Sequence, residues 1–154
     1  MKAIPEGYHS VTPMLILKDA RKAIDFYKQA FGATEQYSVP GPEGKGIMHA
    51  ELMIGDSIIM LGQENPEDKS AETAGCSPVS FYIYVQNADE AFGKAVKAGA
   101  RSAKWGIDDM FWGDRVGVVQ DPFGYTWWLA THKKDVTPEQ MREGAKAMYA
   151  KSPY

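Results

Sequence analysis

The residues best suited to acid–base chemistry in this chain are His49 and Glu51, which lie two positions apart in the segment His-Ala-Glu. Side chains two apart on a β-strand point to the same face, so this imidazole and carboxylate would be neighbours. Glu51 could act as a general base and His49 could orient it, provided that a substrate lies within hydrogen-bonding reach. The simpler interpretation is that the two side chains only hydrogen-bond each other. We retain Glu51 and His49 as candidate catalytic residues.

A second set of residues could bind a flat molecule by aromatic stacking, in which each ring pair contributes about 0.5–1.5 kcal/mol beyond area burial. Residues 104–114, KWGIDDMFWGD, read as a loop because three aromatic residues alternate there with glycines and aspartates. These rings could cover a ligand or close a dimer interface. The strand-like segments 79–85 and 125–130 add more rings. The candidates from all three segments are Trp105, Phe111, Trp112, Tyr82, Tyr84 and Trp128.

The elements that must position these residues occur twice. The segments KDARKAIDFYKQAFGA at 18–33 and QNADEAFGKAVKAGA at 86–100 both contain Asp or Asn followed by Ala, a second Ala, and a final Gly-Ala. Their apolar spacing predicts helices over about 19–31 and 88–98 that end at Gly32 and Gly99. Two such modules bury too little surface alone and should pack together, and the seam between them is a natural ligand site.

Apolar runs around the helices predict strands at 11–17 and 79–85, a hairpin of 49–54 with 57–61, and further strands at 115–120 and 125–130. Thr137 and Gln140 form a capping box with Pro138 at the first helical position, which predicts a tail helix over 137–150. We therefore expect one α+β domain over residues 1–154, with two βαβββ modules whose curled mixed sheets surround a cleft. Module one spans 8–61, a polar linker 62–77 and module two 78–132, and the helix follows.

Composition excludes several partners. A net charge of −3 provides no basic stripe for nucleic acid. No apolar run approaches the 18 residues of a membrane span, and the first ten residues lack the apolar centre of a secretion signal. A single cysteine, Cys76, cannot form an internal disulfide. These features predict a cytoplasmic protein that contacts neither membranes nor nucleic acid.

The doubled order, with DAxxAxxFYxxAFGA at 19–33, resembles the glyoxalase/bleomycin-resistance/dioxygenase group, also called the vicinal oxygen chelate superfamily. Residues 111–132, FWGDRVGVVQDPFGYTWWLATH, are similar to its PhnB-like branch. The resemblance covers residues 8 to 132. It implies eight strands in two curled sheets around a cleft, commonly in a homodimer whose cleft draws on both chains. Asp114-Arg115 matches the family's Gly-Asp-Arg element, where an ion pair that locks the loop is expected.

The resemblance also implies a divalent metal held by His and Glu side chains from four strands. Counted from the apolar ends of the strands, the corresponding positions are Thr12, Met60, Ser80 and Trp128. None supplies an imidazole or a carboxylate. A thioether and neutral hydroxyls bind a hard or borderline dication poorly. We therefore predict no metal at this site and no other cofactor.

If those four positions face the cleft, so do the residues two away on each strand. Residues of the opposite parity, such as Leu15, Leu61 and Trp127, should lie beneath the helices. The rings on the cleft side could instead be ordinary core. The predicted ligand-binding set, with the loop aromatics as lids, is Thr12, Met14, Met60, Ser80, Tyr82, Tyr84, Trp105, Phe111, Trp112 and Trp128.

Three functions fit these patterns. The leading hypothesis is a metal-independent, homodimeric protein that binds or sequesters an aromatic or amphipathic small molecule, as bleomycin-resistance relatives do. The second is a metal-free isomerase or lyase in which Glu51 is the base. The third is a divalent-metal glyoxalase-type enzyme with relocated ligands such as His49 and Glu51, although two ligands on one strand rarely hold a metal.

Overall fold

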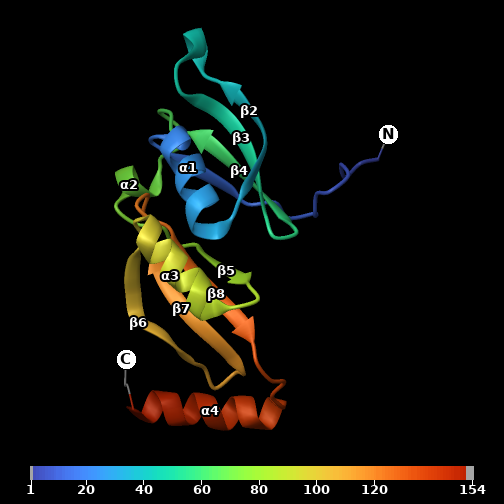
Figure 1. The fold of residues 1–154 in the computed structure, drawn as a ribbon, viewed down its shortest axis with the longest axis vertical. Helices are drawn as coiled ribbons and strands as arrows, with labels where there is room; N and C mark the ends of the chain where they lie inside the picture. The colour runs from blue at the N-terminus through green and yellow to red at the C-terminus, as the bar shows by residue number, and fades with distance from the viewer. Residues whose placement is uncertain (1, 152–154) are drawn as a thin grey trace.

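Each half of the chain folds into a four-stranded mixed sheet with a helix packed on one face, as Figure 1 shows for the computed structural model, which describes residues 2–151. Sheet A has the strand order β1-β4-β3-β2, with β1 parallel to β4 and the other pairs antiparallel. Its elements are β1 (Met14–Leu17), α1 (Ala20–Phe31), β2 (Thr34–Pro40), the 3-10 turn η1 (Pro42–Gly44), β3 (Ile47–Ile54) and β4 (Ser57–Gln63).

Sheet B repeats this plan with the order β5-β8-β7-β6, in which β5 is parallel to β8. The short helix α2 (Ala71–Ala74) connects the sheets, and α4 lies beyond the far end of sheet B (Figure 1). The elements are β5 (Ser80–Tyr84), α3 (Ala88–Ala98), β6 (Arg101–Asp109), β7 (Asp114–Gln120), β8 (Thr126–His132) and α4 (Pro138–Lys151). The predicted α+β class with two βαβββ modules and a C-terminal helix is confirmed.

Both repeated helices begin and end as their sequences predict. The Asp19 carboxylate accepts a hydrogen bond from the Lys22 amide at 3.1 Å, and the Asn87 side chain does the same for the Glu90 amide at 3.2 Å. Such side-chain caps satisfy amide groups that have no partner within the helix. Gly32 ends α1 with a φ of 65°, in the left-handed region that glycine adopts without steric cost.

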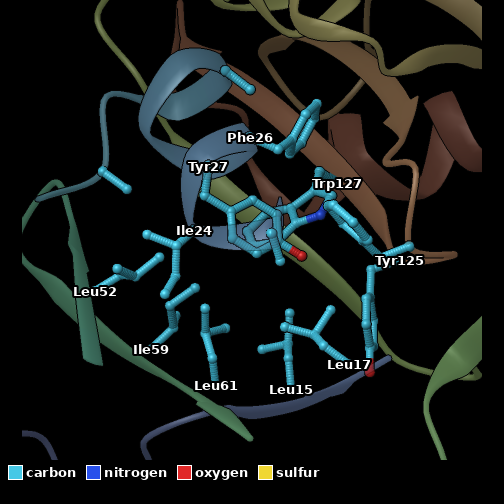
Figure 2. Packing of buried hydrophobic residues seen from close by; sticks show 14 of the residues in the cluster. Leu15, Leu17, Ile24, Phe26, Tyr27, Leu52, Ile59, Leu61, Tyr125 and Trp127 are labelled. Carbon is cyan, nitrogen blue, oxygen red and sulfur yellow. The ribbon is translucent and has the colours of Figure 1, made fainter. Parts of the chain in front are cut away.

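One hydrophobic core extends across both modules. Figure 2 shows Leu15, Leu17 and Leu61 of sheet A pointing toward Tyr27 of α1, which meets Trp127 of sheet B. The Tyr27 and Trp127 ring centroids are 5.4 Å apart, and both side chains are buried. The predicted alternation is therefore confirmed for these strands, whose odd-numbered residues face the helices. The two modules therefore share buried aromatic rings where they meet.

Asp121 in the Asp-Pro-Phe-Gly turn holds the modules together. Its carboxylate is buried and accepts hydrogen bonds from the Tyr27 hydroxyl and the Trp127 indole, both at 2.8 Å, as well as from two backbone amides of its own turn. Tyr125 adds a second link, because its hydroxyl donates to the carbonyl oxygen of Ile16 on β1 at 2.8 Å. The Asp-Pro-Phe-Gly segment is thus both a turn and a junction between the two modules.

Three boundaries differ from the expected ones. The first strand begins at Met14 rather than at residue 11, because Pro13 has no amide hydrogen to contribute to a ladder. The expected loop 104–114 is partly strand, since β6 continues to Asp109 through an irregularity between Ser102 and Ile107. The polar segment 62–77 contains the end of β4 and the helix α2. Within residues 2–151, no helix is long and apolar enough to cross a membrane.

Candidate functional site

The face of sheet B that α3 does not cover carries a group of partly exposed aromatic rings. We call this face the open face, and the rings of Tyr82, Tyr84, Trp105 and Trp128 the aromatic platform. Tyr82 and Trp128 are register partners on β5 and β8, and their rings stack with centroids 6.0 Å apart and planes 23° apart. The ring centroids of Tyr84 and Tyr82 are 5.4 Å apart. Exposed fractions of 40% for Tyr82 and 67% for Tyr84 leave much of these rings accessible to a ligand.

The platform rests on a small apolar cluster. Val116, Val118 and Ala130 are fully buried beneath it, and Trp112 and Trp128 pack against them. Gly117, between the two valines, faces the other side, where a Cβ would lie 2.6 Å from the Phe92 ring of α3. Strand alternation thus places α3 on one side of β7 and the aromatic rings on the other.

Trp105 and Lys104 form the outer edge of the platform. The Trp105 ring meets Trp128 edge-on, with centroids 5.5 Å apart and an interplanar angle of 71°. The Lys104 ammonium lies over both indoles, 5.0 Å from the Trp128 centroid and 5.7 Å from that of Trp105. Cations over indole faces at such distances are attracted by the ring quadrupole. The sequence placed Trp105 in a loop as a lid, whereas the structure places it on strand β6.

A buried carboxylate orients the platform from below. Asp114 accepts hydrogen bonds from the hydroxyls of Tyr82 at 2.8 Å and Tyr84 at 3.2 Å, and its other oxygen lies 2.8 Å from Nδ1 of His132. Burial raises the pKa of Asp114, but the hydrogen bonds from His132, Tyr82 and Tyr84 outweigh it, and the pKa falls below its ordinary value. Burial and the neighbouring carboxylate raise the pKa of Tyr82, so its hydroxyl remains protonated.

The remaining rings of the predicted lid have different surroundings. The Trp112 indole donates to the Tyr82 hydroxyl at 3.2 Å, which attaches it to the platform. Phe111 packs against α4, where a Cβ on Gly144 would come within 2.5 Å of its ring. Arg115 forms the expected ion pairs that lock this loop, with Asp89 at 2.6 Å and Asp109 at 3.2 Å. Asp114, its neighbour in the Gly-Asp-Arg element, instead accepts hydrogen bonds from Tyr82 and Tyr84.

The face of sheet A that α1 does not cover carries a second buried carboxylate with the same kinds of partners. Glu51 is 4% exposed and accepts hydrogen bonds from the hydroxyls of Tyr8 and Tyr37, the latter at 3.0 Å, while Nε2 of His49 lies 3.3 Å away. Burial raises the pKa of Glu51, but these three hydrogen bonds outweigh it and lower the pKa below its ordinary value. The hydrogen bond to Glu51 raises the pKa of Tyr8 to about 12.

This arrangement makes Glu51 a weak base. A general base works best with a pKa near the working pH, and both Glu51 oxygens already accept hydrogen bonds. The predicted His49–Glu51 contact exists, as the simpler interpretation of the pair requires. Glu51 lies on the face of sheet A that α1 does not cover, but Tyr8 and Tyr37 cover it there and supply the hydrogen bonds that offset the cost of its burial.

The structure brings the predicted ligand residues together in two groups. Met14, Met60 and Glu51 are register neighbours on sheet A, whereas Ser80 and the platform rings are on sheet B. Thr12 precedes β1, and its hydroxyl donates to the His9 carbonyl oxygen at 3.2 Å.

A groove of about 1010 Å³ runs between the modules and touches only part of the predicted set. Tyr82 and Tyr84 lie on its wall, but Met14, Met60 and Trp128 do not. Its other walls come from the β3–β4 turn, the end of α1 and the start of α3. The two tyrosines therefore connect the groove with the platform.

The residues at the positions expected for a divalent metal do not fit one. Thr12, Met60, Ser80 and Trp128 offer hydroxyls, a thioether and an indole, none of which suits a hard or borderline dication. The nearby carboxylates of Glu51 and Asp114 are each engaged by two tyrosines and a histidine. Within residues 2–151, no group of three or more His, Cys, Asp or Glu side chains is placed to hold a metal.

Sequence reasoning missed Tyr8, Tyr37, Lys104, Asp114 and His132 as members of these clusters. Tyr8 belongs to an irregular N-terminal segment, and it meets Glu51 across 43 positions of the chain. Asp114 and His132 were visible only as parts of motifs, although each begins or ends a strand beside the platform. The one sequence signal that could have identified Asp114 and His132 is their position at the ends of strands that carry or adjoin aromatic residues.

Comparisons with known proteins agree with this architecture. The sequence model of the Glyoxalase/Bleomycin resistance protein/Dioxygenase superfamily matches residues 9–129. An uncharacterized protein of Mycobacterium tuberculosis is 37% identical over 138 residues, which cover 86% of this chain and 80% of that protein.

Solved structures show the same fold. The crystal structure of an Arabidopsis thaliana gene product is 28% identical with a TM-score of 0.62, and the match covers 80% of this chain and 98% of the other. The PhnB protein of Bacillus cereus, described as a putative 3-demethylubiquinone-9 3-methyltransferase, is 17% identical with a TM-score of 0.61 over 80% of this chain and 99% of the other.

Proposed function

The chain belongs to the glyoxalase/bleomycin resistance protein/dioxygenase superfamily, and on that premise we propose that it binds a flat aromatic or amphipathic small molecule on the platform of sheet B without a metal ion. The observation that carries this proposal is the stacked, partly exposed set of Tyr82, Tyr84, Trp105 and Trp128. Contiguous exposed patches of large apolar side chains commonly mark binding sites.

The platform is suited to binding because its rings are already oriented. Asp114 fixes both tyrosine hydroxyls, and the apolar cluster beneath supports Trp128. Binding therefore costs little side-chain conformational entropy in the protein, which favours affinity. The residue at the family's metal position on β8 supports this proposal, because Trp128 offers a ligand an aromatic ring and has no donor suited to a metal ion.

Replacing Trp128 with alanine should weaken binding of a flat ligand roughly tenfold, which corresponds to about 1.4 kcal/mol. The variant removes the ring that stacks on Tyr82 and meets Trp105. The measurement is quenching of tryptophan fluorescence with naphthalene, quinoline and flavin compounds, followed by isothermal titration of the tightest binder against each variant.

The matched control is Met48→Ala, which truncates an exposed apolar residue on β3 of the other sheet and should bind like the wild type. Equal affinity of the Trp128→Ala variant and the wild type would contradict the proposal, as would the absence of binding by every compound of the panel.

We also propose that the chain forms a homodimer. β1 and β5 are edge strands, and large apolar side chains stay exposed on them or in the segments just before them, namely Val11 at 83%, Met14 at 55% and Val79 at 58%. Unpaired edges with apolar surroundings favour association with another chain. Light scattering during gel filtration should give twice the mass of one chain, and Val79→Asp should shift the protein toward monomer. A monomeric wild type at micromolar concentration would refute this assembly.

A further inference from the structure

The ammonium of Lys104 is the one cation in contact with the platform rings within the described residues. It lies 5.0 Å from the centroid of Trp128 and 5.7 Å from that of Trp105, whose rings meet edge-on. Two indole faces thus share one positive charge. A ligand that stacks on Trp128 would lie beside this charge, so the charge must affect which ligands bind.

The backbone holds Lys104 in this place at a cost. Its φ is 54°, a left-handed conformation that residues other than glycine seldom adopt. It lies in the irregular part of β6 between Ser102 and Ile107, and Gly106 there also has a positive φ of 84°. Bulges of this kind redirect side chains and recur beside functional sites, where the surrounding structure maintains local strain.

Lys104 also has no carboxylate partner. Within residues 2–151 it forms no ion pair, whereas Arg115 on β7 is bound by Asp89 and Asp109. The one buried carboxylate under the platform, Asp114, is occupied by Tyr82, Tyr84 and His132. The ammonium therefore remains available to an anionic group brought by a ligand.

We propose that Lys104 makes the platform selective for flat aromatic compounds that carry an anionic group, such as a carboxylate. This inference rests on the proposed function of the same platform. The ring system packs against the accessible parts of the platform rings, and the anion pairs with the Lys104 ammonium at the platform edge. A cationic ligand meets repulsion from the same ammonium, and a neutral ligand gains only the stacking.

Three matched probes test this selectivity, namely 1-naphthaleneacetate, 1-naphthaleneacetamide and 1-naphthylmethylammonium. Their ring system is constant while the charge changes from negative through neutral to positive. Isothermal titration of the wild type at low salt should show the acetate binding about fivefold more tightly than the acetamide, the gain of a partly exposed ion pair. The ammonium probe should bind most weakly of the three.

Lys104→Asn is the test variant, because asparagine tolerates a positive φ better than most residues and so keeps the bulge. It should bind acetate and acetamide with equal affinity while retaining affinity for the acetamide. Lys133→Asn, which removes the same charge from an exposed site after β8, should keep the wild-type ratio.

The outcomes separate the two proposals. If the wild type binds acetate and acetamide equally, or if Lys104→Asn keeps the preference for acetate, the role of Lys104 is refuted and the platform proposal stands. If none of the three probes binds at millimolar concentration, both proposals are refuted.

Discussion

Asp121→Ala should lower the free energy of unfolding by about 3–5 kcal/mol, because it leaves several buried hydrogen-bond donors without an acceptor. The Asp121 carboxylate accepts four hydrogen bonds, two from the backbone of its turn and two from Tyr27 and Trp127. Alanine leaves the hydroxyl of Tyr27 and the indole N–H of Trp127 without an acceptor in a dry core. Each such group costs about 1–3 kcal/mol.

Urea denaturation monitored by circular dichroism measures this loss. Asp56→Ala is a matched control, since it removes an exposed aspartate from the β3–β4 turn and should change the free energy of unfolding by less than about 0.5 kcal/mol. If Asp121→Ala were as stable as Asp56→Ala, the junction between the modules would not depend on this carboxylate.

Asp114→Ala should affect binding and stability together. Its carboxylate orients Tyr82 and Tyr84, so removing it lets both rings reorient and should lower affinity for a flat ligand by tenfold or more. Because the half-exposed His132 and the exposed Tyr84 can turn to water, the loss of stability should be about 1–3 kcal/mol. Isothermal titration and urea denaturation of one preparation give both quantities.

Glu51→Ala provides an unusually close control. It too removes a buried carboxylate that two tyrosine hydroxyls and a histidine contact, but it does so on sheet A. We expect a comparable loss of stability and unchanged affinity for the ligand of the platform. Equal losses of affinity in both variants would mean that Asp114 acts through global stability rather than through the rings. A loss of affinity in Glu51→Ala alone would place the ligand site on sheet A and would support Glu51 as a general base.

The Asp114 contact also has a defined pH dependence. Hydrogen bonds that His132 donates to Asp114 and then to Asp135 raise the pKa of His132 above its ordinary value, and the pKa of Asp114 is lowered. The His132 contribution to stability is therefore complete below its unfolded pKa of about 6.5 and is lost as the pH rises through the folded value. The Asp114 contribution is complete above its unfolded pKa of about 3.9 and is lost as the pH falls through the lowered folded value.

The stability difference between wild type and Asp114→Ala should consequently be largest between about pH 4 and 6.5. In Asp114→Ala the His132 pKa should fall toward 6.5, which proton NMR of the imidazole can follow. A His132 titration that is identical in both proteins would contradict the contact.

Local sequence signals predicted the helices α1, α3 and α4 and six of the eight strands in the described residues, because these elements depend on neighbours in the chain, whereas β2 and β6 were not assigned residue ranges. Asp19 and Gly32 mark the ends of α1, and the alternation through Leu15 and Leu17 identifies the face that α1 covers. The aromatic parity of β5 and β8 likewise predicted that Tyr82 and Trp128 share a face. These inferences need only strand and helix periodicity.

The clusters that give each face its chemistry could not be predicted, because they join distant segments. Tyr8 meets Glu51 across 43 positions, and Tyr27 meets Asp121 across 94. The burial of Glu51 depends on Tyr8 and Tyr37, which the sequence pattern around Glu51 does not identify. Trp105 was placed in a loop because the irregularity after Ser102 conceals the strand period of β6. Tertiary contacts, rather than local preference, decided these positions.

The central claim is that the open face of sheet B receives a flat ligand, and the four tryptophan side chains test it within one sample. Each indole N–H gives a separate signal in an ¹⁵N-labelled protein titrated with 1-naphthaleneacetate. The account predicts that the signals of Trp105 and Trp128 shift strongly and that of Trp112 shifts less, while Trp127, buried under α1 and bonded to Asp121, stays in place. Shifts confined to Trp127, or no shift of Trp105 and Trp128 while the probe binds elsewhere, would contradict it.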